Sequence, residues 1–364
     1  MTESEDEIYR QLQRHLDSLP IGFPASDTGA DIRVLKAFFT PEEAKCAMFL
    51  DFFPATAKDI WRRVKRKLGM SLEETEQMLQ SMREKGLIYH GEDPATGTML
   101  YLNAPLAIGF FEFAINNLNQ QKVEALEEYL DTYLQEFFST GIPQVRTIPI
   151  NAAVTPEMGI MPYDEVWELV DQMKGPFAIA PCVCVQEREI LGHKCAHELT
   201  ERCLTNSQWY IDQGNAREVT KEEAVALIKK AQEDGLVIQP GNYKKGEWLC
   251  LCCGCCCGIL SNVKKLDKPA QLVATNYYSE VDSDACVACG VCIERCPMNA
   301  IDLEEVALIN RDRCIGCGVC IPTCVSEAIH LKRKEQVIEP PKDRTDMFMK
   351  IMQKKTELKR ANNW

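Results

Sequence analysis

The sequence lacks the long apolar runs of a membrane protein. Among its 364 residues, no stretch reaches the roughly 18 uninterrupted apolar positions that predict a membrane-spanning helix. The chain begins Met-Thr-Glu-Ser-Glu-Asp-Glu, which is acidic and contains no apolar segment, so no secretory leader is predicted. We therefore expect a cytoplasmic protein whose cysteines stay reduced.

The sequence also lacks the recognisable parts of most enzyme sites. No Gly-x-Gly-x-x-Gly follows a predicted strand and no P-loop is present, which argues against the usual dinucleotide and nucleotide sites. There is no Ser/His/Asp or Cys/His arrangement typical of a nucleophilic enzyme. Positive charge is in deficit. The net charge of −13 argues against a general nucleic-acid binder and suits docking on selected basic partners.

Cysteine, by contrast, is abundant, with 19 in the chain. In a reducing compartment, so many cysteines indicate metal ligands and not a disulfide framework. Eight of them form two runs of the pattern Cys-x2-Cys-x2-Cys-x3-Cys, which begin at Cys286 and Cys314. This pattern is typical of 4Fe–4S cluster loops in which the fourth cysteine binds the neighbouring cluster. Zinc ribbons need pairs of Cys-x2-Cys, so structural zinc does not fit these runs.

The two runs therefore predict two 4Fe–4S clusters with crossed ligation. The predicted ligands of the first cluster are Cys286, Cys289, Cys292 and Cys324. The predicted ligands of the second cluster are Cys314, Cys317, Cys320 and Cys296.

This stretch resembles the bacterial two-cluster ferredoxins over residues 278–335. The resemblance is carried by the eight cysteines in register, by Gly290 and Gly318 before each third cysteine, and by Pro297 after the first run. Val325 stands where the motif has a second proline, a departure that affects the stiffness of the loop and not the ligation. The resemblance implies a ferredoxin domain that carries electrons at low potential.

Residues 31–116 predict three helices followed by a β-hairpin, which is the winged-helix arrangement. Each helix start has a Ser or Thr at the N-cap position, where its side chain satisfies free backbone N–H groups. The predicted helices begin at Thr40, Thr56 and Ser71, and the predicted strands cover 87–90 and 98–102.

The segment from Met82 to Ile88 resembles the end of the recognition helix in MarR-type regulators. The third helix, however, begins Leu72-Glu73-Glu74, and the hairpin tip carries Glu92 and Asp93, so carboxylates stand where DNA phosphates would lie. A basic run at 62–67 is either a solvated face or a docking face for an acidic partner. We expect a protein-interaction module here and no nucleic-acid binding.

The middle of the chain contains ten further cysteines, far more than packing alone explains. They are Cys182, Cys184, Cys195, Cys203, Cys250, Cys252, Cys253, Cys255, Cys256 and Cys257. We expect some of them, drawn from both ends of this group, to hold at least one further 4Fe–4S cluster. Two clusters, a larger non-cubane cluster or a zinc site are the alternatives. Because alternate strand residues share a face, Cys250 with Cys252, or Cys253 with Cys255, are the expected pairs.

The residues around these cysteines add further candidates. His193 and His197 flank Cys195 and are candidate ligands, while Arg188 and Lys194 are candidate hydrogen-bond donors to a cluster. Downstream, residues 220–250 predict a helix and a hairpin that deliver the cysteine string. The whole arrangement resembles ferredoxin-type proteins of anaerobic bacteria, which carry Cys-x-Cys and Cys-Cys-x-Cys-Cys-Cys upstream of a dicluster domain.

We expect an α+β multidomain protein with a helix over about 344–360 at its end. The predicted segments are a polar N-terminal arm (1–30), a winged-helix-like domain (31–116), a helical connector (117–175), a Cys-rich α/β metal-binding region (176–270), a two-cluster ferredoxin domain (271–335) and a basic helical tail (336–364).

The leading hypothesis is an iron–sulfur protein that passes low-potential electrons between redox partners. This favours an electron carrier, or an electron-transfer subunit of an oxidoreductase, over a stand-alone enzyme. The expected partners are redox proteins. A homo-oligomer or a hetero-oligomer is compatible with this hypothesis. Two alternatives stay open. One is a redox enzyme subunit with a substrate-binding cluster at 182–257, and the other is an iron–sulfur redox-sensing transcriptional regulator.

Overall fold

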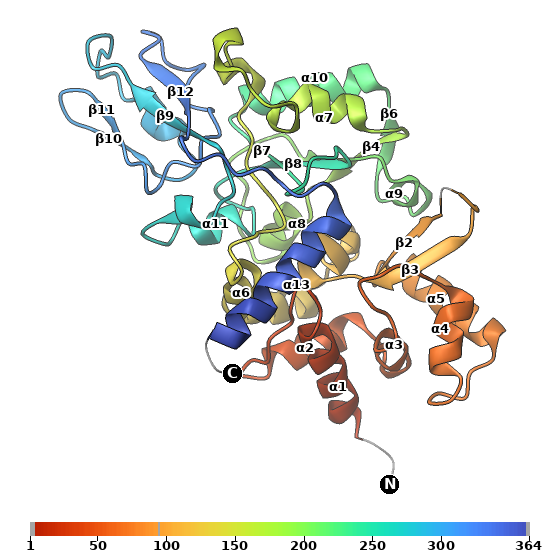
Figure 1. Cartoon of the computed structure of the whole chain (residues 1–364). Helices are drawn as coiled ribbons and strands as arrows, with labels where there is room; N and C mark the ends of the chain where they lie inside the picture. Colours follow the sequence, from red (N-terminus) through yellow and green to blue (C-terminus); the bar gives the residue numbers. More distant parts are fainter. Residues whose placement is uncertain (1–3, 94, 362–364) are drawn as a thin grey trace. The chain divides into compact units, whose positions relative to one another are not determined.

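The computed structural model describes residues 4–93 and 95–361 as a mixture of helices and short strands. The chain forms two compact units, shown in Figure 1. The first unit contains Met1–Thr140 together with Phe348–Trp364, and the second contains Gly141–Met347. Within the described ranges, no helix combines the length and apolar character needed to cross a membrane.

The first unit is mainly helical and has one small sheet. Its elements are α1 (Glu5–Asp17), α2 (Ala30–Phe38), α3 (Pro41–Ala47), β1 (Ala55–Thr56), α4 (Ala57–Val64), α5 (Leu72–Glu84), β2 (Ile88–Glu92), β3 (Met99–Asn103), the distorted turn η1 (Leu106–Phe110), the short turn η2 (Glu112–Ala114), α6 (Gln120–Phe138) and the part of α13 (Arg344–Ala361) from Phe348 onward. The predicted helix starts are confirmed. Thr40 and Ser71 form capping boxes, and the Thr56 side chain accepts a hydrogen bond from the backbone of Asp59.

The hairpin of the first unit follows α5 directly and joins a three-stranded antiparallel sheet in the order β1-β3-β2. Helices α3, α4 and α5 precede this hairpin, as the sequence predicts. Ile60, Leu79 and Met82 are fully buried, so α4 and α5 bury apolar faces.

Helices α1, α2 and α6 form the remaining core of the first unit around buried aromatic rings. Phe23 and Tyr129 pack with their ring centroids 4.6 Å apart, and Tyr129 donates a hydrogen bond to the Pro24 carbonyl oxygen. Helix α13 buries Phe348, and Lys355 on the same helix pairs with Glu136 at 2.7 Å. The predicted C-terminal helix is therefore present and is packed on this unit.

The second unit is built on a five-stranded antiparallel sheet in the order β6-β4-β5-β8-β7. Its elements are the short turns η3 (Asn151–Ala153), η4 (Pro156–Met158), η5 (Pro162–Asp164) and η6 (Pro269–Gln271), the helices α7 (Val166–Gln172), α8 (Val183–Ile190), α9 (Gln208–Asp212), α10 (Lys221–Glu233), α11 (Leu260–Val263) and α12 (Val291–Arg295), and the strands β4 (Phe177–Pro181), β5 (Glu201–Thr205), β6 (Arg217–Val219), β7 (Val237–Pro240), β8 (Trp248–Cys252), β9 (Tyr277–Val281), β10 (Ile301–Leu303), β11 (Ala307–Ile309) and β12 (Ile329–Arg333).

The predicted helix-and-hairpin unit ahead of the cysteine string is present as α10, β7 and β8. Thr220 caps α10, and β7 pairs with β8 through the register Gln239 to Cys250. On its other side β8 pairs with β5, with Cys203 opposite Cys250. The cysteine string therefore leaves a strand held between two neighbours, which fixes the direction of its side chains.

Residues 141–150, which precede η3, form an extended segment that contains the buried Arg146. Arg146 is 3 % exposed and donates to the backbone carbonyls of Gly241, Tyr243 and Tyr163. Its guanidinium lies 3.6 Å from the carboxylate of Asp164, which is also 3 % exposed. Burial raises the pKa of Asp164, and the charge of Arg146 opposes that rise. This pair ties the segment to the hairpin that carries the cysteines.

The last part of the second unit is an approximate repeat of two halves. Strand β9 pairs with β12, and β10 pairs with β11, so each half contributes a strand to both pairs. The eight cysteines predicted as cluster ligands lie in the loops and on the one-turn helix α12 between these strands.

Replacing Asp164 with Asn should destabilise the second unit, because the buried Arg146 charge would lose its partner. The expected cost is roughly 3–5 kcal/mol, seen as a lower urea midpoint by circular dichroism. Asp171→Asn is the matched control, since its ion pair with Lys221 is exposed and should contribute less than about 1 kcal/mol. Equal midpoint shifts in the two variants would contradict the prediction.

Candidate iron–sulfur sites

The backbone of the two ferredoxin-like loops turns back on itself at matching positions. Gly290 and Gly318, the residues before each third cysteine, have positive φ of 77° and 74°. Asn299 and Glu327, each three residues after a fourth cysteine, also have positive φ, at 50° and 54°. Glycine adopts such a conformation without strain, whereas Asn and Glu adopt it at some cost. The matching turns curl both loops around a central space.

Each loop borders a cavity lined by four thiols. One cavity is lined by the first-run cysteines Cys286, Cys289 and Cys292 together with Cys324 from the second run. The other is lined by Cys314, Cys317, Cys320 and Cys296. We name these cavities the first and the second ferredoxin site. The thiols are grouped as the crossed pairing predicts, and their assignment as cluster ligands stays a prediction.

Backbone N–H groups point at sulfur atoms in both ferredoxin sites. Cys296 accepts from Ala300 at 3.3 Å, and Cys324 accepts from the equivalent Ala328 at 3.2 Å. The N–H of Ala307 likewise lies 3.4 Å from the sulfur of Cys286, and that of Ser279 lies 3.3 Å from the sulfur of Cys314. Such donors stabilise thiolates and raise the potential of a cluster held by them. The donor set and its hydrogen bonds thus fit 4Fe–4S clusters.

The two ferredoxin sites differ in exposure. In the second site Cys314, Cys317 and Cys320 are all buried, at 7–9 % exposure. In the first site Cys289 is exposed, and the neighbouring Val287 is 62 % exposed. The first site is therefore the one that lies at the protein surface.

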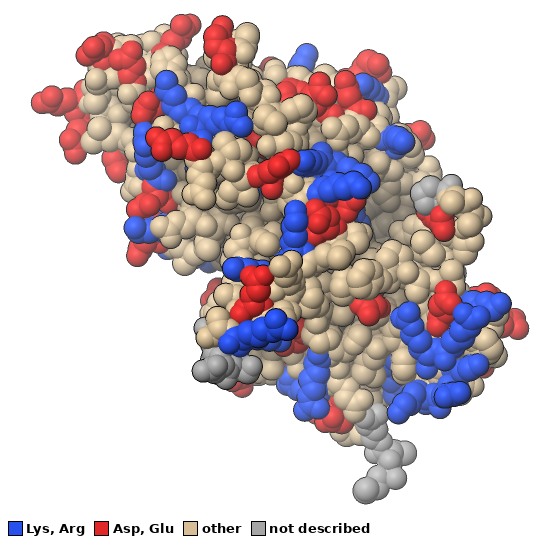
Figure 2. Space-filling view, in the orientation of Figure 1, with Lys and Arg blue, Asp and Glu red and all other residues tan. Residues whose placement is uncertain are grey.

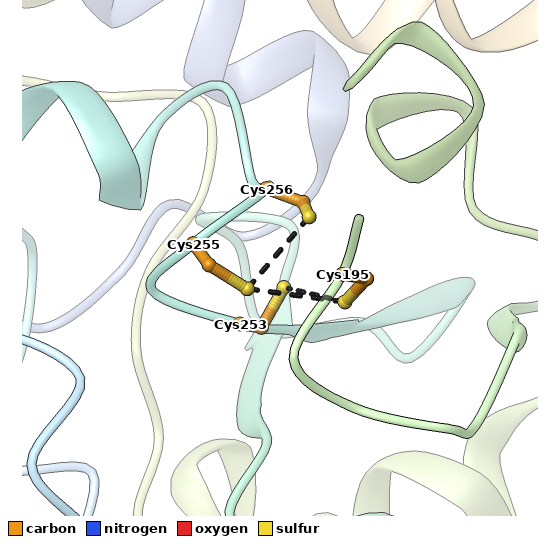
Figure 3. A group of neighbouring side chains, drawn as sticks. All are labelled: Cys195, Cys253, Cys255 and Cys256. Carbon is orange, nitrogen blue, oxygen red and sulfur yellow. Dashed lines mark hydrogen bonds between the residues drawn. The ribbon is translucent and has the colours of Figure 1, made fainter. Parts of the chain in front are cut away.

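A third set of thiols lies outside the ferredoxin part and is shown in Figure 3. The sulfur atoms of Cys195, Cys253, Cys255 and Cys256 all lie within 4.8 Å of one another. Cys195 is 3.8 Å from Cys253 and 3.8 Å from Cys255, while Cys255 and Cys256 are 3.7 Å apart. We call this set the tetrad. As predicted, it draws on both ends of the middle group of cysteines.

The fold positions the tetrad with two segments that are far apart in the sequence. Cys253, Cys255 and Cys256 belong to the turn that follows β8, and Cys195 belongs to the loop between α8 and β5. Figure 3 shows the four side chains pointing toward a common centre. Four thiol ligands around one point suit either a zinc ion or an iron–sulfur cluster.

Arg202 supports the tetrad and was not found from the sequence. Its side chain is 2 % exposed, and it donates to the sulfur atoms of Cys253 and Cys195 at 3.3 Å each. Further bonds to the carbonyls of His197 and Leu199 hold the guanidinium in place. The sequence interpretation named Arg188 and Lys194 as donors, and those roles stay predictions. The only sequence signal for Arg202 is its position beside Cys203.

The electrostatics of the tetrad favour one thiolate before any metal binds. Burial opposes ionisation of Cys195, but a backbone hydrogen bond from His197 and the Arg202 guanidinium outweigh it and lower the pKa to about 7. Burial, followed by the neighbouring Cys255, raises the pKa of Cys253 to about 12. The pKa of Cys256 is raised as well, again first by burial. Full ionisation of the tetrad therefore needs the charge of a metal, which couples binding to proton release.

The other predicted candidates of the middle region lie outside the tetrad. They are Cys182, Cys184, Cys203, Cys250, Cys252 and Cys257. Among the described residues, the tetrad contains cysteine alone, and ligation by His193 or His197 stays a prediction. Burial is the largest of the causes that lower the pKa of His197.

The tetrad turn touches the loop of the second ferredoxin site. Gly254 lies between two tetrad cysteines, and a Cβ at this position would collide with the carbonyl oxygen of Pro297. Pro297 directly follows Cys296, which lines the second ferredoxin site. The absence of a side chain at position 254 therefore allows two cysteine-bearing loops to meet through their backbones.

Comparison with known proteins supports the cofactor. The family model of a 4Fe-4S dicluster domain matches residues 279–325. No curated protein and no solved structure matches the chain. The matched segment, its two thiol-lined cavities and the tetrad together identify an iron–sulfur protein with 4Fe–4S cofactors and a ferredoxin domain toward its C-terminus.

In protein stripped of iron, Cys195 should be the most reactive thiol of the tetrad near neutral pH. The thiolate is the nucleophile, so its alkylation by iodoacetamide should rise as the pH passes through about 7. Peptide mass spectrometry over a pH series would measure this midpoint. Arg202→Gln should move it upward, because a cation that stabilises the thiolate is lost.

Cys46 provides the control for this experiment. It is fully buried, and burial raises its pKa to about 12. It should therefore stay unmodified over the same pH series. Alkylation of Cys195 with a midpoint that does not respond to Arg202→Gln would contradict the assigned role of the guanidinium.

Proposed function

We propose that this protein is an electron carrier, or an electron-transfer subunit, in which three iron–sulfur clusters form a relay. The clusters would occupy the tetrad, the second ferredoxin site and the first ferredoxin site, in that order. The backbone contact between Gly254 and Pro297 is the observation that carries this proposal. It brings the loop between two tetrad ligands against the residue that follows a ligand of the second site.

The step from the second to the first ferredoxin site rests on the crossed ligands. Cys296 belongs to the first run but lines the second site, and Cys324 belongs to the second run but lines the first. Each fourth cysteine is thus connected through a few covalent bonds to the loop of the other cluster. Such short bonded routes favour electron transfer between the two clusters.

The first ferredoxin site is the proposed outlet, because its surroundings suit a partner. Val287 and Leu303 line this site and are 62 % and 40 % exposed, and Val325, which directly follows Cys324, is 78 % exposed. Exposed apolar side chains grouped in this way typically mark interaction surfaces. The acidic residues Glu304 and Glu305 follow Leu303 and are exposed. Figure 2 shows acidic side chains gathered over the region of β10 and β11, and a partner with a basic rim would complement them.

The finer identification of the first unit is also part of this proposal. The order of α3, β1, α4, α5, β2 and β3, with the sheet order β1-β3-β2, supports a winged-helix domain that serves protein interaction. Glu73 and Glu74 lie in the first turn of α5 and are exposed, which disfavours DNA phosphates there. The exposed basic residues at 62–67, on α4 and just after it, form the basic area over this helix in Figure 2 and suit an acidic partner.

The proposal also includes three predictions that rest on the sequence alone. The segment boundaries at 30, 116, 175, 270 and 335, the likeness to proteins of anaerobic bacteria and the cytoplasmic location are part of the proposal. The two alternatives, a substrate-binding cluster and a redox-sensing regulator, lack a specific supporting contact among the described residues.

If the ligation is crossed, replacing the fourth cysteine of one run should change the EPR signal of the cluster held by the other run. Cys324→Ala should change the same EPR signal as Cys289→Ala, although the two residues belong to different runs. Cys296→Ala should instead match Cys317→Ala. The measurement is EPR of the reduced protein under anaerobic conditions. Pairing of Cys324→Ala with Cys317→Ala would reverse the assignment.

Electron delivery from the first ferredoxin site should depend on its acidic rim. With dithionite-reduced protein and a basic cytochrome c as acceptor, Glu304→Gln/Glu305→Gln should slow transfer about three- to tenfold at low ionic strength. The effect should fade as salt is added, because the charges are exposed.

The matched control for this variant is Glu124→Gln/Glu127→Gln on α6, which removes two exposed acids from the first unit. The change in net charge is the same, so a specific docking surface predicts a smaller effect. Equal slowing by both variants would remove the support for an outlet at the first ferredoxin site. Failure of the reduced protein to pass electrons to any acceptor would count against the relay itself.

A further inference from the structure

The ten cysteines of the middle region fall into two spatial sets. The tetrad contains four of them, as described above. The remaining six are Cys182, Cys184, Cys203, Cys250, Cys252 and Cys257. Several of these six contact one another, which sets them apart from cysteines that merely fill a core.

The cysteine string is divided between the sets at two adjacent pairs. Cys253 belongs to the tetrad while Cys252 does not, and Cys256 belongs to the tetrad while Cys257 does not. Neighbouring residues in extended chain point to opposite sides. Cys252 ends β8 and Cys253 directly follows it, so this alternation sends their thiols to opposite sides. Cys256 and Cys257 are divided between the sets in the turn that follows.

The neighbouring strand β5 repeats this division. Arg202 reaches the tetrad sulfur atoms, whereas the next residue, Cys203, lies opposite Cys250 in the β5–β8 register. Because paired residues in an antiparallel sheet share a face, Cys203, Cys250 and Cys252 lie on the face away from Arg202. Two independent elements thus place the tetrad on one side and the remaining thiols on the other.

The thiols of the second set are linked by side-chain hydrogen bonds. Cys257 Sγ lies 3.8 Å from Oε1 of Gln239, which is paired with Cys250 and so shares its face. Cys184 interacts with Cys182 and Cys257, and Cys252 interacts with Cys257 and Cys250. Cys257 stands at the centre of this chain of contacts. Cys252 and Cys257 are buried, at 8 % and 7 % exposure, and Cys182 and Cys184 are half-buried.

Backbone donors are aimed at Cys257 as they are at the ferredoxin thiols. The sulfur of Cys257 accepts from the backbone of Ile259 and Leu260. Such bonds are the signature of the ferredoxin sites, where each cluster has two of them. A set of thiols kept only for packing has no need of donors aimed at sulfur.

We propose that Cys182, Cys184, Cys252 and Cys257 hold a fourth iron–sulfur cluster, separate from the one at the tetrad. Its ligands would all be thiolates, the usual ligands of 4Fe–4S clusters. Cys250 and Cys203 border the same side and are not needed as ligands. The inference rests on the proposed function, because it adds a centre to the relay beside the tetrad. Arg202 acts electrostatically on Cys182 while donating to the tetrad, so the two centres are neighbours.

Two double variants of the full chain test this inference, and they differ only in which side of the string they alter. Cys252→Ala/Cys257→Ala removes two thiols of the proposed fourth cluster, and Cys253→Ala/Cys256→Ala removes two thiols of the tetrad. Iron, sulfide and zinc would be measured after anaerobic purification, together with EPR of the reduced protein. The signals of the two ferredoxin clusters report whether each variant has folded.

The proposal expects about sixteen irons per chain, or four for each of four clusters. Each double variant should lose about four irons and a different EPR signal, and the two losses should add when the variants are combined. These results together would establish two separate centres fed by one cysteine string.

Other outcomes overturn the proposal and are distinguishable from failure of the proposed function. About twelve irons, with loss only in Cys253→Ala/Cys256→Ala, would leave the relay of three clusters and remove the fourth. Loss of one and the same signal in both variants would mean a single shared centre. Zinc in place of iron at this set would also refute the fourth cluster. About eight irons in the unaltered chain would remove the tetrad cluster as well.

Discussion

Thiolates held close together repel one another, and this constraint governs the second unit. In the tetrad the sulfur atoms lie within 4.8 Å, a separation at which like charges raise one another's pKa unless a cation intervenes. Part of the compensation is built into the chain, as the buried Arg202 and the N–H groups aimed at sulfur. The rest has to come from the metal. The pKa of Cys195 is lowered and that of Cys253 is raised, so Arg202 favours the ionisation of only one of these two thiols in the absence of a metal.

The five-stranded sheet determines on which side of the chain each of these thiols lies. Strand β8 lies between β5 and β7, so the residues of its end have fixed sides. Arg202 and Cys203 on β5 face opposite ways, as do the adjacent cysteines at 252–253. In the proposed arrangement, the pairing of β5 with β8 fixes the sides on which the thiols of the string lie, as two separate centres would require.

Local features were predictable from the sequence, and distant contacts were not. The caps at Thr40 and Ser71 are short-range, so the helix starts could be placed to the residue. The spacing of the two ferredoxin runs likewise specifies which thiols can share a cavity. The role of Arg202 depends instead on the register of β5 against β8, and the contact of Gly254 with Pro297 joins loops more than forty residues apart. No spacing rule reports such pairings, because tertiary packing determines them.

The two halves of the ferredoxin part have similar loops, but one loop is buried in the unit and the other lies at the surface. Gly316 and Ala288 occupy equivalent positions, and both have positive φ, at 64° and 53°. A Cβ at Gly316 would collide with the Tyr277 carbonyl oxygen, so glycine is required where the loop is built into the unit. The Ala288 loop lies beside the exposed Cys289, where a side chain has room. In the proposed relay, the buried second ferredoxin site would exchange electrons through the exposed first site or through the tetrad, and not directly with a partner.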